Sequence, residues 1–340
     1  MFNNVYRLTG IKQIERVTSQ IDLSKGAVIV RPLNMAICRA DERYYLGLRD
    51  AKVLAERLPL ALIHEAVGVV VCDQTGTFKT GALVAMVPTN AKEKHEKVSE
   101  NYLRSSTFAS STEDGFMREY VDIEPERLVE IPGHINPEMA AYFEVVSVAV
   151  QAVRRLQGSM MAQEGTIGIW GDGNVAYMTA VVAHVMFPNC KIAVFGKHAE
   201  KLDYVTFADT YLINDVPENV VVDHAIEAVG GRGSEDAINQ IIDLIQPCGS
   251  VVLSGVSEHP VAINTRMVLE KGIALVGTTR STVQDFKDAI ELVANNPEAQ
   301  ERLELLVQNL RDVREVSDII EAFDSDLNMS WGKTIMRWHI

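Results

Sequence analysis

The chain has few cysteines, no long apolar run and no excess of basic residues. Its four cysteines are spread over 340 residues without a CxxC pair, so neither a disulfide framework nor a cysteine-rich structural zinc site is expected. A formal net charge of -14 argues against a nucleic-acid-binding or anionic membrane surface, and any phosphate site must be local. The chain has no apolar run of about twenty residues, which is the length needed to span a bilayer. The N-terminal MFNNVYRLTG lacks the basic start and apolar run of a secretory signal, which predicts a cytoplasmic protein.

The composition and the apolar pattern predict an α/β protein of two domains. With 47% hydrophobic and 23% charged residues the chain is typical of globular proteins, and its length exceeds that of one usual domain. Over residues 27–88 the short, β-branched segments AVIVRPL, VGVVVC and ALVAMVP indicate a strand-rich domain. From Thr166, strands alternate with helical patterns, from TIGIW and VAYMTAVVAHVMF to IALVGTT, as in a doubly wound parallel sheet. A closing strand, GKTIMRWHI, is expected to return to the first domain.

A polar segment without periodicity interrupts the strand-rich part. Residues 92–111 read KEKHEKVSENYLRSSTFASS and contain no cysteine. Such a segment is expected on the surface or at the mouth of a cleft. A binding loop and a surface insert both fit this pattern.

A glycine-rich loop marks a candidate dinucleotide site. Gly171, Gly173 and Ala176 form G-x-G-x-x-A between a strand and a helix. The first glycine permits the tight turn, the second admits the pyrophosphate, and the small third residue lets the helix pack closely on the strand. Asn174 and Val175 begin the helix, whose amide groups would hold the phosphates. A purely structural glycine turn is the alternative.

The end of the next strand indicates which dinucleotide binds. A carboxylate there would bind the ribose 2′-hydroxyl of NAD and repel a 2′-phosphate. The strand KIAVFG instead ends in Gly196 and is followed by Lys197 and His198, with Lys201 one turn further on. These residues predict NADPH, unless the lysines are merely solvated.

Three residues of different types suggest a metal site. Cys38 lies in ICRAD, His64 in IHEAVG and Glu144 in FEVVSVAVQAVRRL. A thiolate, an imidazole and a carboxylate fit a catalytic zinc ion with one position open. Core packing for Cys38, a satisfied buried imidazole for His64 and a helix-start carboxylate for Glu144 are the alternatives, and the residue types alone leave them open.

The order CRAD, HEAVG, DGFMREY, a glutamate before the nucleotide domain, GxGxxA and a closing GKT resembles the zinc-dependent medium-chain alcohol and polyol dehydrogenases over nearly the whole chain. More narrowly, ENYLRSSTFASSTEDGFM, GIWGDGN, VGGRGSEDAINQ, GVSEHPVAINTR and SWGKT are similar to the ribulose-5-phosphate reductases that make ribitol 5-phosphate for teichoic acid and capsule synthesis. The resemblance implies a GroES-like β-rich catalytic domain over residues 1–143 and 281–340. It also implies a Rossmann NADP-binding domain over residues 144–280, with the active site in the cleft between the two.

The resemblance also implies roles for single residues. Cys38, His64 and Glu144 would bind one catalytic zinc ion, with Glu65 as a further ligand in some states or close beside it. Zinc would polarise the substrate carbonyl while NADPH delivers hydride. Arg39 matches an arginine that touches the coenzyme pyrophosphate in related enzymes, although an exposed salt bridge between the domains is the alternative.

Two departures from the family pattern affect these expectations. Ala40 replaces the serine or threonine that commonly starts a proton relay, so Tyr44, Glu65 and a zinc-bound water remain as proton donors. The segment 92–111 lacks the four cysteines of a second zinc lobe, so one zinc ion per chain is expected.

The leading hypothesis is NADPH-dependent reduction of D-ribulose 5-phosphate to D-ribitol 5-phosphate. Another polyol or polyol phosphate, a metal-free quinone-reductase-like enzyme and a non-catalytic NADPH-binding sensor or scaffold are the alternatives. The resemblance further implies a homodimer, formed around VSEHPVAINTRMVLEKGIALVGTT, and a cytidylyltransferase as a possible partner. The substrate phosphate needs fixed cations, and the sequence does not rank the candidates Arg43, Arg49, Arg104 and Arg118.

Overall fold

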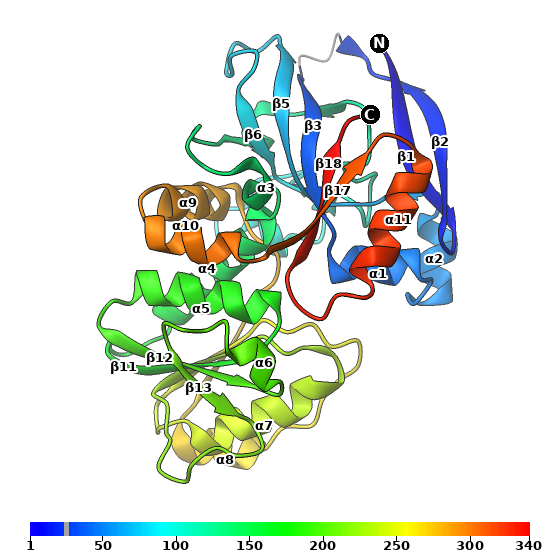
Figure 1. Ribbon diagram of the computed structural model, residues 1–340. Coiled ribbons are helices and arrows are strands. Elements are labelled where there is room, and N and C mark those ends of the chain that lie inside the picture. The colour runs from blue at the N-terminus through cyan, green and yellow to red at the C-terminus, as the bar shows by residue number, and fades with distance from the viewer. Residues whose placement is uncertain (24–26) are drawn as a thin grey trace. The chain divides into compact units, whose positions relative to one another are not determined.

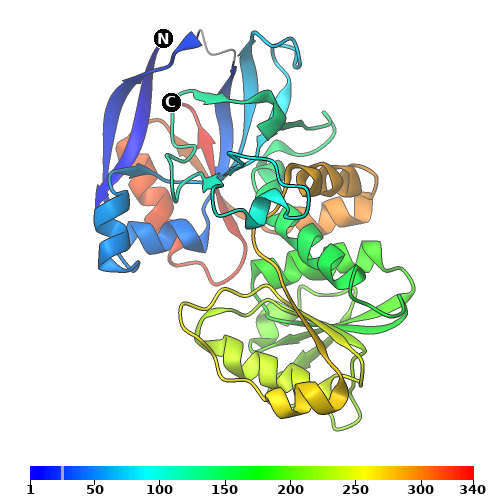
Figure 2. The ribbon, with the colours of Figure 1, turned by 180° about the vertical axis from the view of Figure 1, so that it is seen from behind.

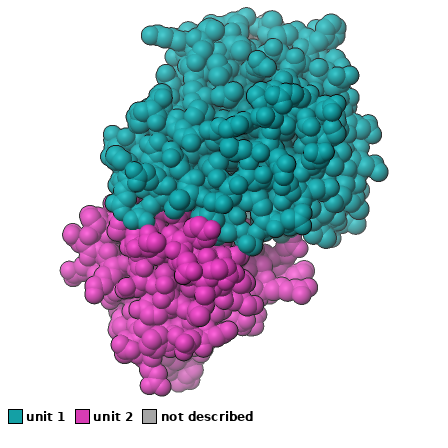
Figure 3. All heavy atoms as spheres, in the orientation of Figure 1, with its two compact units in different colours: residues 1–144, 281–340 teal, residues 145–280 magenta. Residues whose placement is uncertain are grey.

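The computed structural model describes residues 1–23 and 27–340. The chain divides into two compact units, Met1–Glu144 with Ser281–Ile340, and Val145–Arg280 (Figure 3). The first part of the first unit ends at Glu144, next to residue 143, where the sequence analysis expects the boundary. No helix in the described ranges combines the length and the apolar character needed to cross a membrane.

The first unit is built on two sheets. The smaller sheet has the order β2-β1-β4, and the larger has the order β10-β6-β5-β3-β18-β17 with β9 beside β3. The strands are β1 (Phe2–Gly10), β2 (Gln13–Gln20), β3 (Val28–Ala36), β4 (Leu60–Ala61), β5 (Glu65–Asp73), β6 (Leu83–Met86), β9 (Val121–Ile123), β10 (Leu128–Glu130), β17 (Val307–Val313) and β18 (Lys333–Trp338), with the pair β7 (Thr89–Asn90) and β8 (Thr107–Phe108) apart. The helices are α1 (Arg39–Tyr45), α2 (Ala51–Arg57), α3 (Pro137–Ala140), α9 (Val283–Ala294), α10 (Pro297–Glu304) and α11 (Val316–Asp326).

The closing strand of the chain lies in the middle of the larger sheet. β18 pairs antiparallel with β3, where Ile335 faces Ala36, and parallel with β17. Helix α11 packs on β17 and β18. The core here is aromatic, since Trp338 meets Tyr6 edge to face at 5.4 Å between ring centroids. This arrangement brings Lys333, at the start of β18, into the part of the sheet from which β3 leads to Cys38.

The second unit is a parallel sheet with helices on both faces. The strand order is β13-β12-β11-β14-β15-β16, and every pairing is parallel. Helix α5 covers one face, and α7 and α8 cover the other (Figure 1). The strands are β11 (Gly165–Trp170), β12 (Cys190–Gly196), β13 (Asp209–Leu212), β14 (His224–Glu227), β15 (Ser250–Leu253) and β16 (Ala274–Gly277). The helices are α4 (Phe143–Gln157), which starts at the unit boundary, α5 (Asn174–Met186), α6 (Ala199–Leu202), α7 (Ser234–Leu244) and α8 (Thr265–Lys271).

The doubly wound α/β prediction is therefore confirmed. The central strands read as continuous apolar runs because both faces of the sheet are covered. Ile167, Ile169, Val251 and Val252 are fully buried. The glycine loop stands where it was expected, between β11 and α5.

The polar segment 92–111 is exposed over residues 92–99, as expected of a surface excursion, and packs into the first unit over its second part. It contains the short 3₁₀ helix η2 (Glu100–Tyr102) and strand β8, and Asn101, Ser106 and Ser110 are buried. Figure 2 shows it in turquoise, crossing the side of this unit that faces the viewer. Its hydroxyl and amide side chains give it a polar composition, which conceals that burial in the sequence.

Candidate metal and coenzyme sites

The pairing of β3 with β5 brings three metal-ligand types together. Glu65 begins β5 opposite Ala36 on β3, and Cys38 follows β3 as the N-terminal cap of α1. The donor atoms of Cys38, His64 and Glu65 all lie within 4.8 Å of one another. One sulfur, one imidazole nitrogen and one carboxylate oxygen suit zinc, which is borderline between hard and soft. The donor set therefore fits a zinc ion.

Backbone hydrogen bonds between residues 61–63 and 115–116 form a bracket that holds the stretch before His64. The Gly115 and Phe116 amides donate to the carbonyl oxygens of Ala61 and Ile63, both at 2.7 Å. Ile63 has a positive φ of 70°, so this short stretch is bent immediately before the histidine. A Cβ on Gly115 would collide with the carbonyl oxygens of Leu62 and Ile63. Only glycine fits here.

An ion pair secures the same bracket. Asp114 accepts a hydrogen bond from the Ala61 amide at 2.9 Å and pairs with Arg7 at 2.6 Å. The DGFM block is thus fastened both to the stretch that carries His64 and to β1. Arg118 is fastened there too, since its guanidinium donates to the Gly115 carbonyl at 2.8 Å and to the Asp114 carbonyl. Arg118 is therefore a structural residue and not a free cation for a substrate phosphate.

Two buried side chains orient the imidazole of His64. Its Nδ1 lies 2.8 Å from Ser110 Oγ and 3.4 Å from Asp41 Oδ2. Asp41 also accepts the Ile63 amide at 3.1 Å. With Nδ1 engaged, Nε2 is the nitrogen available to a metal, and outer partners of this kind fix the ring orientation. The sequence interpretation missed both residues. Asp41 had a signal, because it stands three residues after Cys38 in CRAD, whereas Ser110 had none.

Burial and neighbouring negative charge oppose the ionisation of the acidic groups in this cluster. Burial raises the pKa of the Cys38 thiol, and the charge of Glu65 adds to this. Burial also raises the pKa of Glu144 to about 7; the charge of His64 opposes this shift and that of Glu65 increases it. A divalent ion would reverse this balance, because it favours the deprotonated forms of its ligands.

The remaining predicted residues lie around the three donors at differing distances. Glu144 is buried and interacts electrostatically with His64 and Glu65, but its oxygens are not part of the compact group. Tyr44 is buried too, and its ring faces the Arg49 guanidinium at 4.9 Å. Arg39 is mostly exposed and pairs with Glu42 at 2.7 Å. The roles of Glu144, Tyr44 and Arg39 stay predictions.

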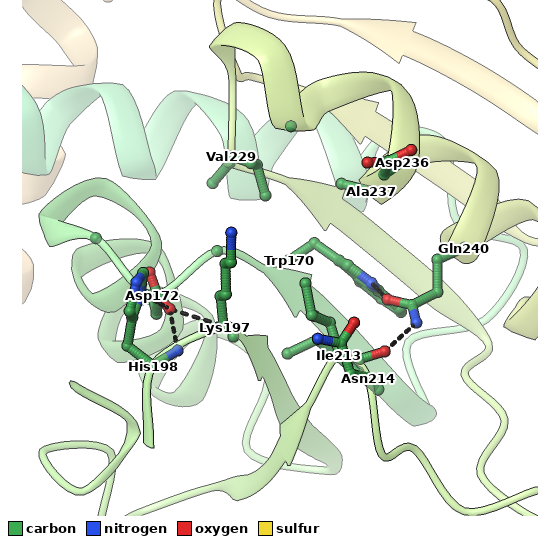
Figure 4. Close-up of a pocket in the computed structure, with 16 residues that line it drawn as sticks. Trp170, Asp172, Lys197, His198, Ile213, Asn214, Val229, Asp236, Ala237 and Gln240 are labelled. Carbon is green, nitrogen blue, oxygen red and sulfur yellow. Dashed lines mark hydrogen bonds and ion pairs between the residues drawn. The ribbon is translucent and has the colours of Figure 1, made fainter. Parts of the chain in front are cut away.

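The second unit contains a cavity of about 570 Å³ around the glycine loop. Gly171, Gly173, Gly196, Lys197 and His198 line it. Gly171 has a φ of 134°, and its missing Cβ leaves room for the Ala176 methyl group. The Lys197 side chain extends across the cavity toward Val229 (Figure 4). Lys201, Asn174, Val175 and Ala176 are not among the lining residues in the part of the chain that the structure describes.

An acidic residue inside the glycine loop fixes the turn after β12. One oxygen of Asp172 accepts hydrogen bonds from the Lys197 and His198 amides at 2.7 and 2.8 Å, and it lies 2.9 Å from His198 Nδ1 (Figure 4). Burial opposes ionisation, but these donors lower the pKa of Asp172. The carboxylate thus anchors Lys197 at the cavity edge. The sequence interpretation missed it, although an acid within G-x-G is itself a signal.

Aromatic rings form the floor of this cavity. Trp170 stacks on Phe195 with 3.9 Å between ring centroids, and its Nε1 donates to Gln240 at 2.8 Å. Gln240 in turn donates to the Ile213 carbonyl at 2.7 Å. A flat apolar floor beside a glycine loop and a lysine suits a nucleotide with phosphate groups.

Comparisons with known proteins show the family of the chain. Residues 24–133 match the family model described as an alcohol dehydrogenase GroES-like domain, and residues 178–295 match the model described as a zinc-binding dehydrogenase. The ribulose-5-phosphate reductase 1 of Staphylococcus aureus is 46% identical over 339 residues, which is 99% of each chain. The ribulose-5-phosphate reductase of Bacillus spizizenii is 47% identical over 100% of each chain. The crystal structure of S. aureus TarJ in complex with NADPH is 42% identical, covers 100% of each chain and has a TM-score of 0.90.

Proposed function

Because the chain belongs to the zinc-binding alcohol dehydrogenases and, within them, to the ribulose-5-phosphate reductases, we propose that it reduces D-ribulose 5-phosphate to D-ribitol 5-phosphate with NADPH. The observation that carries the proposal is full-length identity of 46% and 47% to two such reductases, in a chain that keeps a buried sulfur, nitrogen and oxygen donor set. The product is a precursor for teichoic acid or capsule, and the enzyme works in the cytoplasm.

The first unit supplies the metal site of this reaction. Cys38, His64 and a carboxylate from Glu144 or Glu65 would hold one zinc ion, which would supply a Lewis acid for the carbonyl of the substrate. Asp41 and Ser110 engage Nδ1 of His64, which would leave Nε2 for the metal. Ala40 cannot pass a proton, so the proton reaches the product from Tyr44, Glu65 or water.

The second unit supplies the coenzyme site. The glycine loop and the N-terminus of α5 would hold the pyrophosphate, and Lys197 would bind the 2′-phosphate. NADPH provides the hydride for the reduction. Arg39 stays a candidate for binding the pyrophosphate, and its exposed guanidinium pairs with Glu42 at 2.7 Å.

The direct test of this function is the loss of NADPH absorbance with D-ribulose 5-phosphate. NADH and unphosphorylated ribulose serve as parallel controls. Rapid oxidation is expected only with NADPH and the phosphorylated sugar. If zinc-replete protein oxidises NADPH with another polyol phosphate and not with this one, the substrate assignment is wrong. If it turns over no carbonyl compound at all, the enzyme assignment is wrong as well.

Lys197→Ala should change coenzyme preference. The lysine extends into the coenzyme cavity, and a hydrogen bond to a charged group contributes about 1.5 to 3 kcal/mol. The KM for NADPH should therefore rise by roughly 10- to 100-fold while the KM for NADH changes little. Steady-state kinetics with both coenzymes measures this. Lys201→Ala is the matched control, because Lys201 does not line the cavity. Equal changes for the two coenzymes would contradict the role given to Lys197.

The chain forms a homodimer through β16. This strand ends the parallel sheet, so its outer backbone groups are left for another strand. The flanking segment exposes Val256 by 63% and Leu269 by 79%, which favours a covered surface. Light scattering should give twice the mass of one chain, and the mass of a single chain would refute the dimer. A cytidylyltransferase that consumes the product is a further partner under this proposal.

A further inference from the structure

A fully buried carboxylate stands at the end of β14, in the unit that contains the coenzyme cavity. Glu227 is the last residue of this strand and is 0% exposed. One of its oxygens accepts hydrogen bonds from the Val229 and Gly230 amides at 2.9 and 2.8 Å, and the other accepts the Gly255 amide at 3.0 Å. All three partners are donors, so the group acts only as an acceptor, which is the role of an ionised carboxylate. Glu227 therefore binds two separate pieces of backbone through one charged group.

Backbone amides alone balance the charge of this carboxylate. In residues 1–23 and 27–340 no lysine, arginine or histidine forms an ion pair with Glu227, and its partners are the three amides. Burying a charge costs free energy unless hydrogen bonds compensate it, and an apolar side chain would avoid that cost. What the carboxylate adds is a directed hold on backbone donors, which apolar packing does not supply.

The two loops that Glu227 ties together are in contact with each other. The chain turns sharply after β14, since Gly230 and Gly231 have φ values of 63° and 58°. The Gly231 amide then donates to the Val256 carbonyl at 2.8 Å. A Cβ on Gly255 would collide with the Gly230 nitrogen and with both carboxylate oxygens. The loops after β14 and β15 thus enclose the carboxylate, and neither can shift without withdrawing a donor from it.

The loop after β14 forms part of the wall of the coenzyme cavity. Ala228 and Val229 line this cavity together with Trp170 and the glycine loop, and the Lys197 side chain extends toward Val229 across it (Figure 4). The Ala228 amide also donates to the Trp170 carbonyl at 2.8 Å. Both loops follow the carboxyl ends of parallel strands, where ligands bind in open sheets of this type. The position of this wall is therefore set directly by Glu227.

We propose that Glu227 is a positioning residue for the coenzyme, because its carboxylate fixes the loops after β14 and β15 and so keeps Ala228 and Val229 in place as a preformed wall of the cavity. The proposal rests on the coenzyme site of the proposed function, but it does not depend on the substrate or the metal. An amide in place of the carboxylate turns an N–H donor toward a backbone N–H donor. The loops then lose their common acceptor, and ordering them again when the coenzyme binds lowers the affinity.

The test compares two acid-to-amide changes at opposite ends of the same strand. Asp223 immediately precedes β14 and accepts the Thr166 amide at 2.7 Å, and it does not line the cavity in the part of the chain that the structure describes. In the full-length Glu227→Gln protein, the dissociation constant for NADPH, measured by its fluorescence, should rise by about tenfold or more, a change of about 1.4 kcal/mol. In Asp223→Asn it should stay unchanged.

Hydrogen exchange separates this local effect from a general loss of stability. In coenzyme-free Glu227→Gln, the amides of residues 228–231 and 255–256 should exchange faster, while those of β11 and β12 keep their protection. Saturating NADPH should restore protection to both loops. If Glu227→Gln does not fold, Glu227→Asp applies the same test, since its carboxylate is one methylene too short to hold both loops.

Three results would overturn the proposal. The first is an unchanged affinity for NADPH in the folded Glu227 variant, and the second is an equal loss of affinity in Asp223→Asn. The third is faster exchange over the whole parallel sheet, which would mean that Glu227 serves stability alone. If the unaltered chain bound no NADPH, the coenzyme of the proposed function would be refuted and this inference with it. Binding without a difference between the variants would refute the inference only.

Discussion

Cys38→Ser should contain less zinc than the unaltered chain and lose turnover by about 1,000-fold or more. The thiolate supplies both a negative charge and a polarisable donor, and a serine hydroxyl at neutral pH supplies neither. The loss should exceed the 10- to 100-fold effect typical of outer partners such as Asp41 and Ser110. Metal analysis by atomic emission and the NADPH absorbance assay measure the two consequences on the same protein.

Cys72→Ser is the matched control for this change. Cys72 lies near the end of β5 and is exposed, so its replacement should leave zinc content and turnover unchanged. Full activity of Cys38→Ser in the absence of metal would refute the zinc mechanism and favour a metal-free reductase. Activity loss with full zinc content would instead mean that the cysteine acts on the substrate and is not needed for metal binding.

Gly115→Ala should lower the free energy of unfolding by about 2 to 3 kcal/mol and reduce zinc content. The added methyl group would strike the carbonyl oxygens of Leu62 and Ile63, so the bracket that presents His64 must open. The loss should therefore appear both in stability and at the metal. Urea unfolding gives the first quantity, and zinc per chain after dialysis gives the second.

The control for this prediction is another glycine of the same unit. Gly133 has no heavy atom within 4 Å of a built Cβ and no positive φ, so Gly133→Ala should change stability by only a few tenths of a kcal/mol. If both alanine variants unfold alike, the bracket does not depend on the close approach at Gly115. If Gly115→Ala is destabilised but keeps its zinc, His64 is held by Asp41 and Ser110 alone.

Much of the second unit could be predicted because its pattern is local. The alternation of strands and helices from TIGIW onward placed β11, α5 and β12 within a residue or two of their observed ends. Helix α8 was not separated from the proposed association segment, although Asn264 caps its start and Gly272 ends it with a φ of 62°. Strand β17 reads VQNLRDV and is half exposed, so it lacks the apolar signal of a core strand.

The metal cluster was predictable only in part, because its supports come from distant segments. Cys38, His64 and Glu65 stand in short motifs close to one another in the sequence, and strand pairing does the rest. Ser110 reaches His64 from a polar segment without a pattern, and Lys333 reaches Glu65 across 268 residues. The lysine lies in the block SWGKT, whose similarity to known reductases was visible, but nothing in the sequence assigned it a partner.

The place of β18 in the sheet has a consequence for protein synthesis. Glu65 leaves the ribosome long before its partner, since 268 residues separate it from Lys333, or roughly half a minute at about 10 residues per second. Residues 145–280, which form the second unit, are made entirely within that interval. Until β18 is made, the buried carboxylate of Glu65 therefore lacks the ammonium group of Lys333. The ion pair beside the candidate metal ligands is thus completed only when the last strand to be made enters the sheet.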